Sequence, residues 1–387
     1  MPMVAISAAA LLGLGWSCAL QSFTKGGPQL LASGGAGGAG GRASTTMGSG
    51  GVGAACQSDA YPVPPTVNDT NTKFEFYAAI RSVYFTDEDS RPVGVDLDRR
   101  CTCDPTGYDE GPSCQHEPGV DTICDLGNGR DNAFYEIVQL VKILFQLDFE
   151  SSFSESSEDG SATLLFRVQD YNGLPDDPKV RVSVYSGSGR TTPPAWDGTD
   201  TWPVSQASIV EGGTTIDEPR YYDDAAYVTN GRLVSGLNSS VVSFAGSNGR
   251  IDLELLGGGL VADVQDGDDG WELRNGVFTG LLSEEGLFRS VASYRDQAGM
   301  AFCPDSSAYR QGAFLFCNAR DSSVNPNPGP TAPCDAISFA MGFTAEPASG
   351  VEAITPVPPS SDPCMGDLPT SCESFLGAGG GGGAGGN

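Results

Sequence analysis

The chain has 387 residues, with 49 acidic against 21 basic side chains, a formal net charge of −28 and eleven cysteines. Such a negative surface repels nucleic acid and anionic lipid headgroups, which argues against both as partners. Eleven cysteines indicate an oxidising compartment, and the single histidine, His116, excludes a zinc protease helix with two histidines.

The N-terminus is typical of an exported bacterial lipoprotein. Residues 1–17 are uncharged and apolar, and a short run at Leu11–Leu14 is followed by Ser17 and Cys18. The run suits a signal peptide but is too short to span a bilayer. We therefore expect a signal peptide at 1–17, lipidation of Cys18, and a lipid anchor at the outer membrane or cell surface. Secretion without a lipid is the alternative.

The remaining sequence divides by composition. Residues 18–71 are rich in Gly, Ala and Ser and are predicted to be a flexible tether. Residues 72–300 are predicted to form a β-rich domain, and 301–376 its cysteine-rich C-terminal part. The glycine-rich end, 377–387, is predicted to be disordered.

Two segments have the apolar spacing of helices. The first covers about 132–149, where Phe134, Ile137 and Val141 recur at helical intervals. The second covers about 284–297, with Ser283 as its N-cap and Gly299 beyond its end. Both are predicted to be packing elements.

Strands dominate the rest of the domain. Apolar and polar residues alternate over 180–185 with Val180, Val182 and Val184 on one face, and 163–169 is predicted to pair with this segment. Three Asn-Gly pairs, Asn230–Gly231, Asn248–Gly249 and Asn275–Gly276, predict two-residue hairpin turns. The pattern predicts a mainly β fold of the α+β type: an antiparallel β-sandwich or barrel with two packed helices and disulfide-linked loops.

Four short motifs resemble those of a group of uncharacterised bacterial exported lipoproteins with glycine-rich tethers. They are Gly94–Asp98, Gly129–Phe134, Trp196–Asp200 and Glu218–Tyr221. The resemblance covers roughly residues 72–294. It implies export and anchoring, but no catalytic residue, ligand or cofactor.

Ten cysteines remain when Cys18 is set aside, an even number that allows five disulfides. They are Cys56, Cys101, Cys103, Cys114, Cys124, Cys303, Cys317, Cys334, Cys364 and Cys372. Cys101 and Cys103 are too close to bridge each other, so each is expected to pair outward. We expect the cysteines between 101 and 124 to cross-link their own loop, and those from 303 onward, with Cys56, to cross-link the C-terminal part. Zinc bound by the first group and His116 is the alternative.

Two further features are candidates for ligand binding. Asp266, Asp268 and Asp269 lie in a glycine loop that could hold calcium, although the loop departs from the EF-hand pattern. Two other acidic loops contain Asp96 with Asp98 and Asp197 with Asp200. For all of them, solvated turn carboxylates are the competing interpretation. Trp196, Trp202, Tyr221 and Tyr222 could form an aromatic platform for sugar rings, or could be buried plugs.

No catalytic motif is present, and no pair of acids stands out among so many. We therefore predict no catalytic residue and no cofactor, with calcium as the possible exception. The predicted function is that of a non-catalytic, surface-tethered lipoprotein that binds a carbohydrate or protein partner. The alternative is an exported glycosidase-like hydrolase with paired carboxylates, which requires a concave pocket with two facing acids.

Overall fold

The structure is a computed structural model that describes residues 59–70, 72–103, 109–117, 120–145, 148–187, 189–246, 249–295, 301–325, 331–356 and 368–379. These residues belong to one compact unit. The predicted signal peptide, Cys18, Cys56 and Cys364 lie outside the described residues, as does most of the predicted tether and tail.

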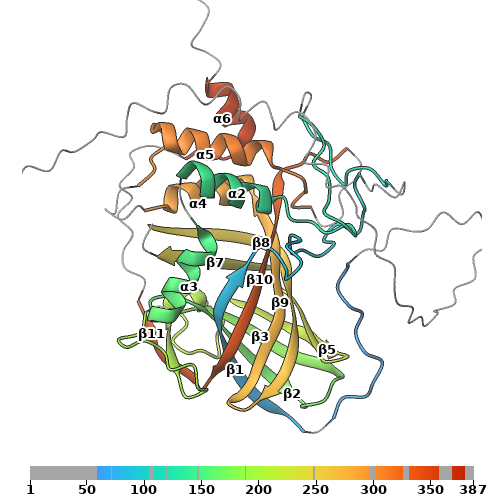
Figure 1. Ribbon diagram of the computed structural model, residues 1–387, viewed down its shortest axis with the longest axis vertical. Coiled ribbons are helices and arrows are strands. Elements are labelled where there is room, and N and C mark those ends of the chain that lie inside the picture. The colour runs from blue at the N-terminus through green and yellow to red at the C-terminus, as the bar shows by residue number, and fades with distance from the viewer. Residues whose placement is uncertain are drawn as a thin grey trace, which may run out of the picture. The chain divides into compact units, whose positions relative to one another are not determined.

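Eight antiparallel strands close into a barrel, which decides between the sandwich and the barrel that the sequence left open (Figure 1). Around the barrel the order is β6, β5, β3, β2, β1, β10, β9 and β8, and β8 pairs with β6 to close it. The strands are β1 (Phe74–Tyr84), β2 (Leu164–Tyr171), β3 (Asp177–Ser186), β5 (Tyr221–Thr229), β6 (Arg232–Gly236), β8 (Gly249–Gly267), β9 (Gly270–Ser283) and β10 (Ala336–Ala348).

Closure depends on glycines in the middle of the long strand β8. The first half of β8 pairs with an additional strand, β7 (Ser239–Gly246), and its second half pairs with β6. At Gly258 the backbone has a φ of +82°, and a Cβ on Gly259 would lie 1.9 Å from the carbonyl oxygen of Ser235. Only glycine therefore allows β8 to change partners here.

Alternating side chains fill the barrel, as the sequence pattern predicted. Val180, Val182 and Val184 of β3 all face the interior. Phe166 lies there with Phe343, their ring centroids 5.2 Å apart, and the other strands contribute further buried side chains. The interior is thus a packed core, in which aromatic rings occupy the centre.

Helices cover one end of the barrel (Figure 1). They are α2 (Phe134–Phe145), α3 (Phe149–Asp159), α4 (Glu284–Ser293), α5 (Ser307–Asn318) and α6 (Cys372–Gly379). The two predicted helices are present as α2 and α4, but each ends four residues before the predicted boundary. The sequence reasoning missed α3, α5 and α6. Among the described residues, no helix has the length and apolar character needed to cross a bilayer.

The outer face of the barrel carries a second, smaller core. A parallel pair of strands, β4 (Thr201–Ser205) and β11 (Gly350–Thr355), covers it. Trp202 of β4 packs there against the outward-facing Ala79, Leu165 and Tyr185 of β1, β2 and β3. These three strands are therefore buried on both faces.

The hairpin turns confirm one of the Asn-Gly predictions and correct another. Asn230 and Gly231 both have positive φ and join β5 to β6, as predicted. Asn275–Gly276 lies inside β9 and makes no turn. Gly276 is needed there because a Cβ would lie 2.4 Å from the ring of Phe343 on the neighbouring strand. The described part of the β7–β8 hairpin does not include Asn248.

Candidate functional site

The loop between β4 and β5, residues 206–220, is closed at its base by backbone pairing. It begins with the short 3-10 helix η2 (Gln206–Ser208). Ile209 then bridges to Pro219, and the amide of Arg220 donates to the carbonyl of Ser208 at 2.8 Å. The two ends of the loop are thus held together at the barrel wall.

Side chains of the loop fold its tip. The carboxylate of Glu218 accepts the amide of Thr214 at 3.1 Å and the hydroxyl of Thr215 at 3.3 Å. The amide group of Gln206 donates to the carbonyl of Gly213 at 3.0 Å. The tip therefore has a defined shape without a ligand.

A buried arginine fixes this loop to the barrel. Arg167 of β2 is 8% exposed and pairs with Glu75 of β1 at 2.8 Å and with Asp217 of the loop at 2.7 Å. The hydroxyl of Tyr185 donates to the carbonyl of Ile216 at 2.6 Å. The loop is preorganised by these contacts, because a displacement would leave the Arg167 charge buried without its Asp217 partner.

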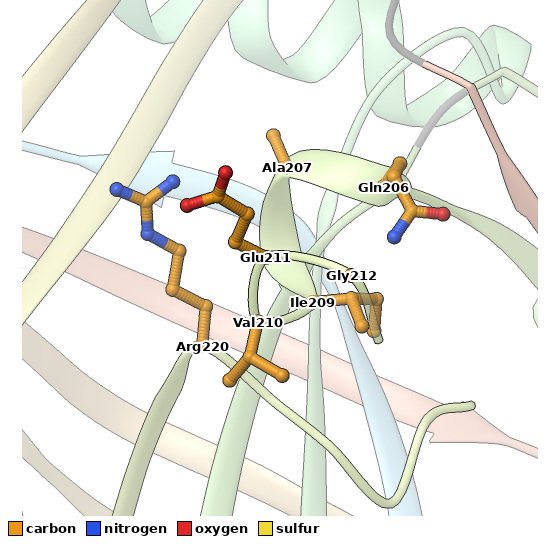
Figure 2. A pocket seen from close by; sticks show the side chains of 7 residues that line it. All are labelled: Gln206, Ala207, Ile209, Val210, Glu211, Gly212 and Arg220. Carbon is orange, nitrogen blue, oxygen red and sulfur yellow. The ribbon is translucent and has the colours of Figure 1, made fainter. Parts of the chain in front are cut away.

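The 206–220 loop contains a pocket of about 530 Å³, which we call the loop pocket (Figure 2). It is lined by Gln206, Ala207, Ile209, Val210, Glu211, Gly212 and Arg220. Figure 2 shows the charged ends of Glu211 and Arg220 pointing in the same direction. Neither charged group forms an ion pair or side-chain hydrogen bond with another described residue, although the Arg220 guanidinium lies 5.6 Å from the ring centroid of Tyr221. The N–H groups of Arg220 and the carboxylate of Glu211 can therefore contact a ligand. Glu211 is the only acid in the lining.

The aromatic platform expected from the sequence is wrong. Trp202 is fully buried and Tyr221 is 6% exposed, and the two belong to different cores. Trp196 is partly buried against Trp202, while Tyr222 is exposed. Successive residues of a strand point to opposite faces, so Tyr221 and Tyr222 cannot share a platform. Trp202 and Tyr221 are therefore buried plugs, which is the other interpretation that the sequence allowed.

The structure does not assemble the calcium site expected at Asp266, Asp268 and Asp269. These residues lie at the exposed turn between β8 and β9, where Gly267 pairs with Gly270. They are not among the described groups whose ligand atoms lie within 4.8 Å of one another. A two-residue turn directs its side chains outward into water, which is the solvated arrangement that the sequence also allowed.

A different acidic cluster, formed by Asp96, Asp98 and Asp131, has the spacing of cation ligands. Its carboxylate oxygens lie within 4.8 Å of one another, and Asp96 and Asp131 are buried. Asp131 was not identified from the sequence because it lies 33 residues after Asp98. Oxygen ligands of this type suit calcium, and these three side chains could hold it.

Hydrogen bonds also give this cluster a structural role. The Asp131 carboxylate accepts the amides of Leu97 at 2.6 Å and Asp98 at 3.2 Å, and so folds the loop that precedes α2. Burial, followed by the charge of Asp98, raises the pKa of Asp131 well above its ordinary value. Burial also raises the pKa of Asp125 to about 7 and that of Asp321 to about 6. Protonation of some of these carboxyl groups therefore reduces the electrostatic repulsion among them.

Three disulfides are present in the described part of the chain. They join Cys103 to Cys124, Cys317 to Cys372, and Cys114 to Cys334. Cys101 and Cys303 are disulfide-bonded as well. The outward pairing of Cys103 is confirmed, and the alternative zinc site shared by the 101–124 cysteines is wrong because Cys103 pairs with Cys124 and Cys114 pairs with Cys334.

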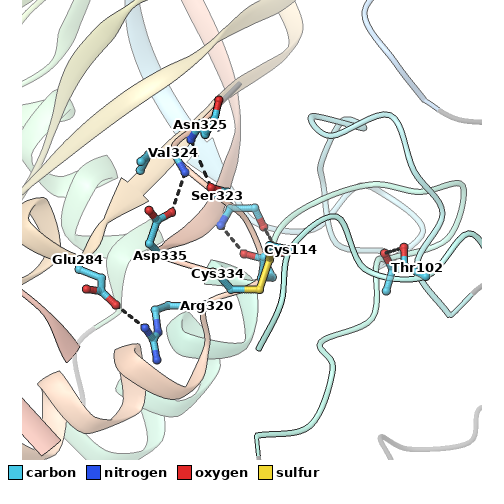
Figure 3. Close-up of a disulfide and its surroundings, with 12 residues drawn as sticks. Thr102, Cys114, Glu284, Arg320, Ser323, Val324, Asn325, Cys334 and Asp335 are labelled. Atoms are coloured by element: carbon cyan, nitrogen blue, oxygen red, sulfur yellow. Dashed lines mark hydrogen bonds and ion pairs between the residues drawn. A yellow bond between two sulfur atoms is a disulfide. The ribbon is translucent and has the colours of Figure 1, made fainter. Parts of the chain in front are cut away.

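The third disulfide corrects the expectation that each group of cysteines pairs within itself. Cys114 and Cys334 are 220 residues apart, and their disulfide links the loop before α2 to the segment before β10 (Figure 3). Backbone pairing explains the connection. The amide of Gln115 donates to Ala332 at 2.6 Å, and that of Cys334 donates to Gln115 at 3.1 Å. Such long-range pairing cannot be read from sequence spacing.

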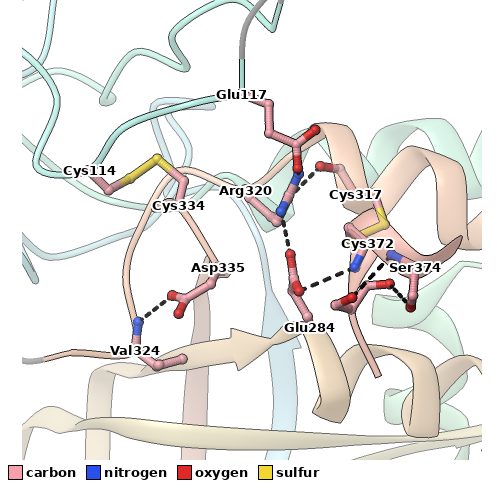
Figure 4. A network of polar contacts seen from close by, with 11 residues as sticks. Cys114, Glu117, Glu284, Cys317, Arg320, Val324, Cys334, Asp335, Cys372 and Ser374 are labelled. Atoms are coloured by element: carbon pink, nitrogen blue, oxygen red, sulfur yellow. Dashed lines mark hydrogen bonds and ion pairs between the residues drawn. A yellow bond between two sulfur atoms is a disulfide. The ribbon is translucent and has the colours of Figure 1, made fainter. Parts of the chain in front are cut away.

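Arg320 connects the region of this disulfide to the helices (Figure 4). Its guanidinium pairs with Glu117, 3.0 Å away, and with Glu284 at the start of α4, and it donates to the carbonyl of Cys317 at 2.7 Å. Glu284 also accepts the amide of Cys372 at 3.2 Å. The arginine thus joins three elements at the covered end of the barrel.

Nothing in the sequence marks the loop pocket, because its residues form neither a motif nor a periodic pattern. Arg220 lies within the Glu218–Tyr221 motif of the resemblance, but Gln206 and Glu211 lie outside it. Comparisons of the chain with protein-family models, curated proteins and solved structures find no match. The function is therefore inferred from the geometry of the loop pocket.

Proposed function

We propose that the chain is an exported, surface-tethered, non-catalytic protein that binds a neutral carbohydrate in the loop pocket. The observation that carries the proposal is the lining itself: the Arg220 guanidinium, which stacks on Tyr221 but has no ion pair, and the Glu211 carboxylate, which has no partner among the described residues, lie in the same lining as the exposed side chain of Val210. Arg220 can donate to sugar hydroxyls, Glu211 can accept from them, and the exposed side chain of Val210 can contact the C–H face of a sugar ring. The net charge of −28 favours a neutral over an anionic ligand.

The same lining disfavours the alternative function, a hydrolase with paired carboxylates. Glycoside hydrolysis by that mechanism needs two acids, roughly 5 to 10 Å apart, on either side of the scissile bond. The loop pocket has a single acid, Glu211. The barrel interior offers no second location, because Phe166, Phe278 and Phe343 fill its centre.

Substitution of Arg220 by alanine is expected to weaken carbohydrate binding by about tenfold or more. Loss of one charge-assisted hydrogen bond costs ~1.5–3 kcal/mol, which corresponds to that factor. Isothermal titration with soluble neutral glucans, mannans and galactans measures the effect, and Glu211→Gln should act in the same direction. Asp224→Ala is the matched control, since Asp224 is an exposed acid that pairs with Arg181 outside the pocket.

Two results would contradict the proposal. One is that the wild-type protein binds none of these glycans, or that the two pocket variants bind them as well as it does. The other is that the wild-type protein releases new reducing ends from a glycan and the Glu211→Gln variant does not. That result would establish the hydrolase. Melting temperatures of all variants should be equal to within a few degrees, because both pocket side chains are exposed.

Anchoring is part of the proposal and rests on the sequence of the first 18 residues. Substitution of Cys18 by serine is expected to move the protein from the membrane fraction to the soluble fraction, because an acylated N-terminal cysteine supplies the anchor. Fractionation followed by immunoblotting measures the change. A Cys18→Ser protein that still sediments with membranes would contradict lipidation at this residue.

A further inference from the structure

The Cys114–Cys334 disulfide has a histidine beside it. The two sulfur atoms and a ring nitrogen of His116 lie within 4.8 Å of one another. Nε2 of His116 is buried and has no hydrogen-bond partner. A buried ring nitrogen normally has a partner, so an imidazole that lies beside two sulfur atoms and has an unpartnered nitrogen indicates an interaction that the oxidised site does not provide.

Contacts of the backbone and an ion pair, in addition to the S–S bond, hold the segments of Cys114 and Cys334 close together. Gln115 forms a parallel bridge with Pro333, through the backbone hydrogen bonds of Gln115 to Ala332 and of Cys334 to Gln115. The pairing of Arg320 with Glu117 fixes the same loop one residue beyond His116. These contacts do not involve sulfur, so breaking the S–S bond does not by itself remove them.

We propose that Cys114, His116 and Cys334 form a redox-gated zinc site, closed as a disulfide under oxidising conditions and available to zinc after reduction. Two thiolates and one imidazole are ligands that zinc prefers, and a water molecule would complete its tetrahedral shell. The site is separate from the loop pocket and from the proposed carbohydrate binding.

The chemistry requires a two-electron reductant, which a dithiol can supply. Thiol–disulfide exchange transfers two electrons and two protons to the protein: the Cys114–Cys334 S–S bond breaks, two thiols form, and the reductant becomes a disulfide. Zinc then displaces both thiol protons, which pass to solvent. The metal replaces the covalent link between the 114–116 loop and the 332–334 segment.

The proposal is tested on the full chain before and after reduction with a non-chelating phosphine. The reduced wild-type protein is expected to bind one more zinc ion at this site than the oxidised protein, as measured by metal analysis and chelator competition. Cobalt, used as a spectroscopic substitute, should give thiolate charge-transfer absorption. His116→Gln keeps both thiols and should weaken zinc binding by about tenfold or more.

Reduction also opens the other disulfides, so two double variants serve as controls. Cys103→Ser with Cys124→Ser should retain the site, whereas Cys114→Ser with Cys334→Ser should lose it. Equal zinc binding by oxidised and reduced protein, unchanged binding in His116→Gln, or retained binding in the Cys114/Cys334 double variant would each overturn the proposal. If reduction unfolds the chain, the His116→Gln variant will bind as the wild type does, which also overturns it.

Discussion

Replacement of Trp202 by alanine is expected to lower the free energy of unfolding by about 3–5 kcal/mol, a large part of the ~5–15 kcal/mol by which a domain is stable. Trp202 is fully buried in the outer core between β4 and the barrel. Its ring lies 5.6 Å from that of Trp196, and the guanidinium of Arg190 lies 5.1 Å above it. Removal of the indole leaves a cavity on the outer face of β1, β2 and β3.

Equilibrium unfolding in denaturant measures this change, and Tyr222→Ala is its control. Tyr222 is 41% exposed and contacts Arg181 only as a surface cation–π pair, 4.9 Å away. Its removal should cost about 1 kcal/mol or less. A Trp202→Ala protein as stable as Tyr222→Ala would mean that β4 and β11 do not close over the barrel as described.

Stability is expected to decrease as the pH rises from about 4 to about 7. Burial raises the pKa of Asp125 to about 7 and that of Asp321 to about 6, and it raises the pKa of Asp131 as well. A carboxyl group with a raised pKa binds its proton more tightly in the folded than in the unfolded chain. Between the unfolded value near 3.8 and the folded values, the folded state therefore holds more protons, and a rise in pH favours unfolding.

The expected loss is on the order of 2–4 kcal/mol across this interval, after allowance for solvent around the partly exposed Asp125. Unfolding curves at several pH values measure it. Asp125→Asn should flatten the dependence, because an asparagine oxygen can still accept the amide of Thr102 but does not titrate.

The matched control for the pH dependence is Asp109→Asn in the same loop. The exposed Asp109 has a lowered pKa, because its carboxylate accepts the amides of Cys103 and Gly111. It therefore releases its proton below this pH interval, and its variant should keep the wild-type slope. An unfolding free energy that rises from pH 5 to pH 7 in the wild type would contradict the burial of these carboxyl groups.

The sequence predicted those parts of the fold in which local pattern and tertiary environment agree. The alternation at Val180, Val182 and Val184 identified the inner face of β3, and Asn230–Gly231 identified a hairpin because both positions need positive φ. The apolar spacing from Phe134 to Val141 identified α2, since those residues face the core. Each of these sequence patterns lies within about ten consecutive residues.

Where distant segments meet, local sequence patterns predict the structure incompletely or wrongly. Asn275–Gly276 has the composition of a turn but serves β9, because Gly276 makes room for Phe343 on the adjacent strand. No strand was predicted after residue 300, yet β10 lies between β1 and β9. Trp202 was considered for a surface platform because its cover, β11, lies about 150 residues later in the chain.

The sequence by itself determined the acidic, cysteine-rich character of the chain, its antiparallel β fold and the inner face of β3. These properties depend on composition and on contacts between near neighbours. Only the tertiary structure decided the closure of the barrel, the Cys114–Cys334 pairing, the acidic cluster and the loop pocket. Each of these depends on residues brought together from separate strands and loops, and local spacing carries no information about such contacts.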